Sequence, residues 1–152
     1  MYKKEPESQQ EFIDFYLPFG GHLNKDNRWV RLAEKIPWKE FEAEYQETLS
    51  GSDQGAPAKP FRMALGALVI KEKLRITDEE TVAQIRENPY LQYVIGMEGF
   101  TNETPFNSSM MVHIRERIGP DMLSRMNKII REEEVKKNKK KIRNLKKKKK
   151  LH

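Results

Sequence analysis

The chain has 152 residues, enough for one domain with extensions, and its mean hydropathy of −0.85 leaves much of it exposed to solvent. It contains no cysteine, which excludes disulfides and thiolate zinc sites and fits a reducing cytoplasm. No apolar run approaches the roughly 20 residues of a membrane span, and no apolar block follows the N-terminal residues, so we expect neither a transmembrane helix nor a signal peptide.

The net charge of +6 is unevenly distributed along the chain. Of the 29 lysines and arginines, 11 lie between 136 and 150, where no acidic residue occurs, so the other 18 face 23 acidic residues and give the rest of the chain a net charge of −5. A run of like charges is usually solvated. We therefore predict a basic tail at 132–152, either disordered or a solvated helix, that is a simple extension or contacts a polyanion.

Residues 1–27 are predicted to form an N-terminal arm. Its apolar residues suit an extended segment docked on a domain, and Phe19–Gly21 interrupts any regular element. The arm's apolar residues are Phe12, Ile13, Phe15, Tyr16 and Leu17.

Two short helices are predicted next, over 28–36 and from Pro37 onward, separated by the proline. Trp29 or Val30 lies on the apolar side of the first helix, and Trp38 begins the stripe of the second. Tryptophans at such positions are usually core anchors, with base stacking as the less common alternative.

The central prediction is a helical core between Phe61 and Gly96. Apolar residues at spacings of three and four predict a helix over 61–75 with one buried stripe. Thr77 is placed to cap a second helix. Asn88–Pro89 begins a third, because a proline at the first helical position loses no hydrogen bond. Gly96 is predicted to close it in a left-handed conformation.

Two further helices are predicted after a loop that ends at Pro105. The first covers 108–118 and is closed by Gly119–Pro120, and the second begins at Pro120 and loses its apolar face after Ile130. We find no internal repeat and no convincing strand. The sequence therefore predicts an all-α, compact multi-helix domain over 28–131, including a helix-turn-helix-like element.

Catalytic chemistry has little support in these residues. His22, His113 and His152 are scattered, with no carboxylate at metal-ligand spacing, so we expect no metal site. The glycine patterns of nucleotide-binding loops and of serine hydrolases are absent. We therefore expect no cofactor, no small-molecule substrate and no enzymatic activity.

DNA binding is the better-supported chemistry. In a helix-turn-helix, the second helix presents polar side chains to the major groove. The helix over 108–118 is the candidate recognition helix, although Glu116 would oppose a phosphate and its arginines could serve only solubility. We expect base contacts from Ser109 and His113 and phosphate contacts from Arg115, Arg117, Arg125, Lys139, Lys140, Lys141 and Arg143.

Several motifs in fixed order resemble the N-terminal domain of bacterial insertion-sequence transposases of the InsH-like type. The resemblance covers nearly everything from about Arg28 to Ile130. The motifs are Leu32–Trp38, Pro57–Lys71, Leu74–Gly96, Glu98–Phe100, Thr104–Phe106 and Met111–Gly119.

The resemblance implies a helical module that binds the terminal inverted repeats of its element during DNA transposition. In that family a lysine-rich linker leads to an RNase H-like domain with an Asp-Asp-Glu metal triad. Because this chain stops within the lysines, we expect a truncated transposase without the catalytic domain, located in the cytoplasm at the nucleoid. A frameshift in the lysine codons is our hypothesis for the truncation.

Two alternatives remain open from the sequence. One is a non-specific polyanion binder that acts through the lysine tail alone. The other is a regulatory fragment that pairs with full-length transposase through the face formed by Leu123–Ile130.

Overall fold

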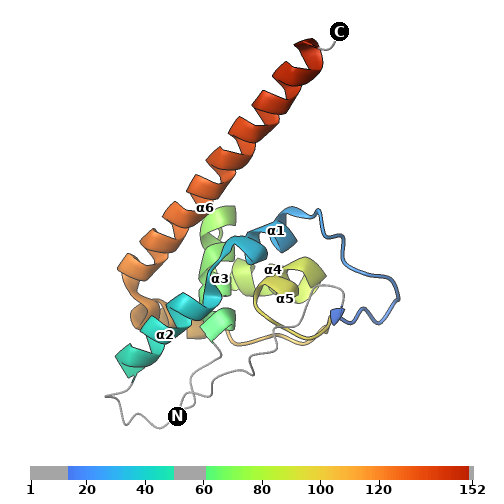
Figure 1. Cartoon of the computed structure of the whole chain (residues 1–152). Coiled ribbons are helices and arrows are strands. Elements are labelled where there is room, and N and C mark those ends of the chain that lie inside the picture. Colours follow the sequence, from blue (N-terminus) through green and yellow to red (C-terminus); the bar gives the residue numbers. More distant parts are fainter. Residues whose placement is uncertain (1–13, 50–60, 151–152) are drawn as a thin grey trace.

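The computed structural model describes residues 14–49 and 61–150, and in these two ranges the secondary structure is helical, with no strand (Figure 1). Phe12, Ile13 and the predicted loop at 50–57 lie outside the described residues. The all-α prediction is confirmed. The helices are α1 (Arg28–Lys35), α2 (Trp38–Leu49), α3 (Phe61–Leu74), α4 (Asp78–Glu87), α5 (Pro89–Val94) and α6 (Met110–Lys150).

Helix α3 is the centre of the molecule. It contacts α2, α4, α5 and α6, and every residue from Ala64 to Ile70 is buried. The sequence predicted a single buried stripe of apolar residues on this helix, but the buried surface is wider. A helix that has neighbours on all sides is apolar on all its faces. Gly66 lets α5 approach closely, since a β-carbon there would lie 3.1 Å from the Val94 carbonyl oxygen.

The predicted ends of the core helices are confirmed. Thr77 Oγ1 accepts a hydrogen bond from the Glu80 amide at 3.1 Å, and Asn88 Oδ1 accepts one from the Tyr90 amide at 2.9 Å, which caps α4 and α5. Gly96 has a φ of +81°, and the Met97 amide donates to the Gln92 carbonyl at 3.0 Å. This pair of features is the Schellman arrangement of a helix C-terminus.

Both tryptophans are core residues, as predicted, with 6% of each side chain exposed. Asn27 caps α1 by accepting a hydrogen bond from the Trp29 amide at 2.8 Å. The Trp38 indole nitrogen donates to the Ala33 carbonyl at 2.9 Å and so joins the first two helices. The Trp38 indole is therefore satisfied inside the core, and the burial of both residues does not favour base stacking.

The N-terminal segment packs against the loop between α5 and α6. The Tyr16 amide donates to the Glu98 carbonyl at 3.1 Å, and the Phe100 amide donates to the Tyr16 carbonyl at 2.8 Å. Phe15 is buried, with Leu17 and Leu23 beside it in the core cluster. The part of the predicted arm that the structure describes is therefore docked on the domain.

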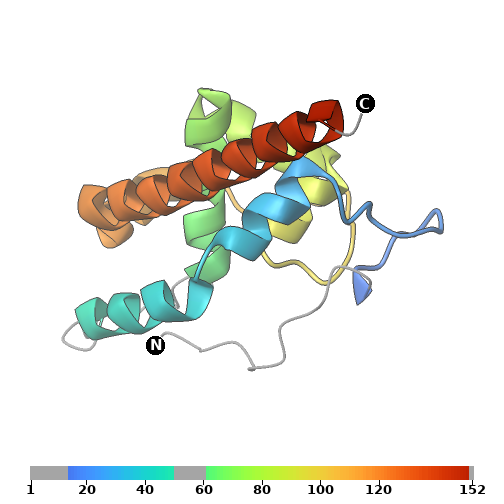
Figure 2. The ribbon, with the colours of Figure 1, turned by 45° about the horizontal axis from the view of Figure 1, so that its top comes forward.

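Helix α6 has two halves that differ in their surroundings. Gly119, with φ +77° and ψ 157°, kinks the helix just before Pro120, so the predicted break is a kink from which the helix resumes at once. Up to Ile130 the helix packs on α3. From Arg131 to Lys150 no residue is buried, and the helix projects from the domain (Figures 1 and 2). Its buried residues are Met111, Ile114, Ile118, Met122, Met126 and Ile130.

Candidate nucleic-acid interface

The start of α6, the candidate recognition helix, presents polar side chains to solvent. Asn107 Oδ1 accepts a hydrogen bond from the Ser109 amide at 3.0 Å in the turn that leads into the first helical residue, Met110. Ser109 itself is exposed. The His113 side chain is 60% exposed, and its Nδ1 lies 3.9 Å from a Glu116 carboxylate oxygen. The two predicted base contacts are therefore on the accessible surface.

The segment before this helix does not confirm a helix-turn-helix. In that motif a turn of about three or four residues joins the two helices. Here residues 95–109 separate α5 from α6 as a long loop. Gln92 holds the loop against the core, because its side-chain amide donates to the Thr101 carbonyl at 2.9 Å and accepts from the Thr101 amide at 3.0 Å.

Arg115 is engaged by the domain itself. Its guanidinium makes a two-pronged ion pair with Asp78 at the start of α4, at 2.6 and 3.0 Å. Lys71 Nζ lies 3.1 Å from the same carboxylate. These contacts, led by the hydrogen bond from Arg115, lower the pKa of Asp78. A DNA phosphate would have to compete with this carboxylate for the guanidinium.

Arg125 is engaged in the same way, and Arg117 lies next to Tyr45 of α2. Arg125 makes a two-pronged ion pair with Glu44 of α2, contacts Asp121 at 3.1 Å, and lies over the ring of Phe41. Burial raises the pKa of Tyr45, and a hydrogen bond from Arg117 opposes that shift. Of the four arginines predicted to contact phosphates, Arg115, Arg117 and Arg125 thus interact with other helices of the domain, and only Arg143 does not within the part of the chain that the structure describes.

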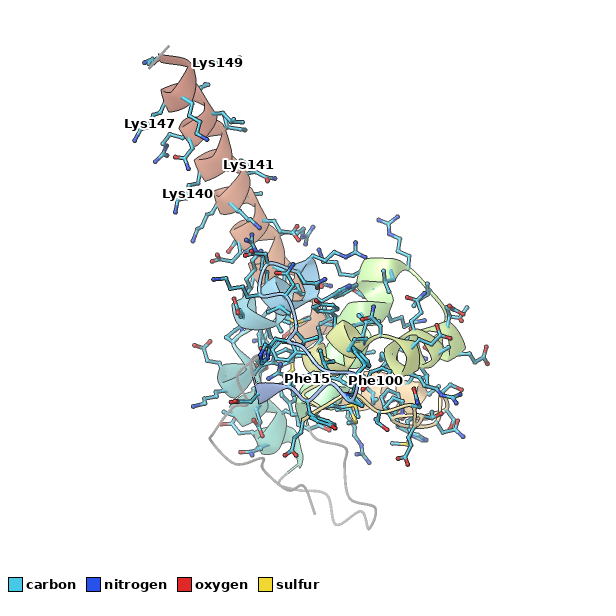
Figure 3. The ribbon with its side chains drawn as sticks, turned by 90° about the vertical axis from the view of Figure 1, so that its right-hand side faces the viewer. Phe15, Phe100, Lys140, Lys141, Lys147 and Lys149 are labelled. Carbon is cyan, nitrogen blue, oxygen red and sulfur yellow. The ribbon has the colours of Figure 1, made fainter. Side chains whose placement is uncertain are left out.

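The projecting half of α6 carries the other predicted cations. Lys139, Lys140, Lys141 and Arg143 are all exposed, and the helix continues to Lys150, so the described part of the predicted tail is a solvated helix. Figure 3 shows Lys140, Lys141, Lys147 and Lys149 along this free length of helix.

A basic groove between α1 and α6 is the part of the surface that sequence reasoning missed. Its volume is about 380 Å³, and Trp29, Leu32 and Leu74 supply its apolar lining. One carboxylate, that of Glu134, also lines it. Its six basic residues are Arg28, Arg31, Lys35, Lys73, Lys137 and Lys141.

A signal for one wall of this basic groove was present in the sequence. Arg28, Arg31 and Lys35 recur at spacings of three and four, which places them on one helical face. The prediction for residues 28–36 uses only the apolar face of that helix. The opposite wall could not be paired with α1 from the sequence, because more than a hundred positions separate Lys35 from Lys137.

The face formed by Leu123–Ile130 is occupied by the protein's own core. Met126 is fully buried, Ile130 is 3% exposed, and Leu123 and Ile129 are partly buried against the core cluster. Because α3 covers this side of α6, the predicted pairing surface for full-length transposase is not available. That part of the prediction was wrong.

Residues 14–49 and 61–150 contain neither a metal-binding cluster nor a membrane-spanning helix. No group of three His, Cys, Asp or Glu side chains is placed to hold a metal ion. No helix there combines the length and the apolar character required to cross a membrane.

Comparison with known proteins agrees with the predicted family. The family model described as "Transposase domain (DUF772)" matches residues 18–117, more than half of the chain. The "uncharacterized protein ORF8 in nfe locus" of Rhizobium meliloti is 37% identical over 106 residues, or 68% of this chain. The chain spans 49% of the length of that relative. No solved structure matches the chain. The protein belongs to the DUF772 family of transposase domains.

Proposed function

We propose that the chain is the DNA-binding module of an insertion-sequence transposase and recognises the terminal inverted repeats of its element. The observation that carries this proposal is the projecting half of α6. This helix extends from a transposase-family domain, and between 136 and 150 its charged residues are all basic. Such a surface suits the sequence-independent part of DNA binding, which is electrostatic.

Two groups of residues would contact the DNA, one its bases and the other its phosphates. Ser109 and His113 are exposed at the start of α6 and would contact base edges. Lys139, Lys140, Lys141 and Arg143 would contact phosphates. We assign no phosphate contact to Arg115, Arg117 or Arg125, because other helices already engage their guanidinium groups.

A competition gel shift tests the proposed function. The probe is a duplex with the inverted repeats that flank the gene, and the competitor is an unrelated duplex of equal length. We expect the complex with the repeats to resist an excess of competitor. A protein with S109A and H113A should lose about 1–3 kcal/mol of this discrimination and still bind unrelated DNA. Equal displacement by both duplexes would contradict inverted-repeat recognition.

The second candidate is non-specific polyanion binding, which the exposure of the tail lysines favours. In that case the unrelated duplex would compete fully, and S109A with H113A would change nothing. Both candidates place the protein on the chromosome, in the bacterial nucleoid. They differ only in whether bases are distinguished.

A further inference from the structure

The fold brings two separate sets of like charges to opposite sides of one concave surface. Arg28, Arg31 and Lys35 come from α1, while Lys137 and Lys141 come from the first turns of the projecting half of α6. The two helices are in contact at this point, and Figure 2 shows α6 running across α3 toward α1. The basic groove therefore lies where the projecting helix leaves the domain.

Four of these cations have no ion-pair partner in the part of the chain that the structure describes: Arg28, Lys35, Lys137 and Lys141. Arg28 lies over the Trp29 ring, with its guanidinium carbon 5.1 Å from the ring centroid. A folded protein usually separates or pairs like charges at this density, because their repulsion costs stability.

The acidic residues nearby neutralise only part of this charge. Glu134 pairs with Lys73 at 2.7 Å, and Asp26 pairs with Arg31 at 3.1 Å. Asp26, Glu34 and Glu133 line the adjoining depression, together with Lys25 and three cations of the groove itself, Arg31, Lys35 and Lys137. Within the basic groove itself six cations face the single carboxylate of Glu134, so an excess of positive charge remains.

The position of Lys137 reflects this crowding. Partial desolvation, followed by the charges of Arg31, Lys35 and Lys141, lowers the pKa of Lys137 against the opposing effect of Asp26. An anion in the basic groove would relieve that repulsion and contact cations from both walls at once.

We propose that the basic groove binds phosphates of the DNA backbone and fixes the direction in which α6 follows the duplex. This inference rests on the proposed function, and it adds α1 as a second DNA-contacting element. In the free protein the basic groove has an excess of positive charge, and the phosphates of a bound duplex would neutralise it. The groove contacts carry no sequence preference, because phosphates are identical in every duplex.

A pair of substitutions, one from each wall, tests the groove. K35Q with K137Q removes two cations that have no ion-pair partner among the described residues. The matched control, K39Q with K128Q, removes two exposed cations that do not line the groove. Affinity for an unrelated duplex is measured over a salt series, and the thermal unfolding midpoint is measured without DNA.

For K35Q with K137Q we expect a smaller salt dependence of DNA affinity without any loss of thermal stability. Two lost phosphate contacts reduce the slope of log affinity against log salt by about 1.8, whereas the control leaves the slope unchanged. Its unfolding midpoint without DNA should equal or exceed that of the wild type, because repulsion is removed. A purely structural role for these lysines would instead lower the midpoint and leave the slope intact, and that result would overturn the proposal.

The outcomes also separate this inference from the proposed function. A wild type that binds unrelated DNA without preferring its own repeats overturns the proposed function and leaves the groove testable by the slope. A wild type that prefers its repeats, with an unchanged slope in K35Q with K137Q, overturns the groove alone. No binding to any duplex overturns both.

A small phosphate ligand is the competing occupant with the same chemistry. Inorganic phosphate, added at constant ionic strength, would then raise the unfolding midpoint of the wild type but not of K35Q with K137Q. That result, with an unchanged duplex slope, would assign the groove to a free phosphate compound and contradict the proposal.

Discussion

The two halves of α6 contain similar residues in different surroundings. In the first half, up to Ile130, Arg115 and Arg125 bind Asp78 and Glu44 from other helices, and the apolar side lies on α3. In the second half the cations are exposed, and Val135 and Ile142 are at least half exposed as well. The same residue types stabilise the fold in one half and remain available for a partner in the other.

This difference shows that charge on a helix indicates a binding surface only where no other element supplies the opposite charge. Glu44 lies far from Arg125 in the sequence, yet α2 and α6 bring the two together. The basic groove is the reverse case, because the fold adds cations of α1 to those of α6.

Truncating one apolar side chain in each half gives the largest contrast. M126A should lower the free energy of unfolding by about 2–5 kcal/mol, because Met126 is fully buried against α3. V135A should change it by less than about 0.5 kcal/mol, because Val135 is 50% exposed. Urea denaturation measures both. Similar losses in the two variants would show that the second half of α6 is packed after all.

Removing the Asp78 carboxylate tests the ion pairs of the first half. D78N should lower the free energy of unfolding by about 1 kcal/mol, since Arg115 and Lys71 both lose their anionic partner at a site that is only partly exposed. E132Q, at an exposed position of α6, is the control and should change little. Equal stability of D78N and the wild type would mean that Arg115 is free to contact DNA.

Acid should weaken the same contacts. Hydrogen bonds from Arg115 and Arg125 lower the pKa values of Asp78 and Glu44 below their ordinary 3.8 and 4.5. A carboxyl group with a lowered pKa stabilises the fold above its ordinary pKa, and this contribution is lost as the pH falls through the folded value. Stability should therefore decline below about pH 4.5, and less steeply in D78N with E44Q. Parallel curves for the variant and the wild type would contradict this account.

The sequence predicted those parts of the fold that depend on local chemistry. Thr77, Pro89 and Gly96 each determine the backbone within a few residues and act as predicted, while Gly119 kinks α6 where a helix end was predicted. The all-round burial of α3 was underestimated, because a periodic pattern shows where apolar residues gather and cannot show how many neighbours a helix has.

The candidate interface was harder to predict than the fold. Exposure of Ser109, His113 and the tail lysines followed from local pattern alone. The engagement of Arg115 by Asp78 and the meeting of Lys35 with Lys137 depend on tertiary packing. The sequence around each of these residues does not show which distant residue will lie next to it in the fold.

The most direct test of the account compares two charge-matched variants of α6, R115Q with R125Q and K139Q with K140Q. For each, the unfolding midpoint and the salt dependence of DNA affinity are measured. We predict that the arginine pair lowers the midpoint and keeps the wild-type slope, while the lysine pair keeps the midpoint and reduces the slope by about 1.8. A reduced slope with unchanged stability for the arginine pair, and neither change for the lysine pair, would contradict the division of α6 into a structural half and a DNA-binding half.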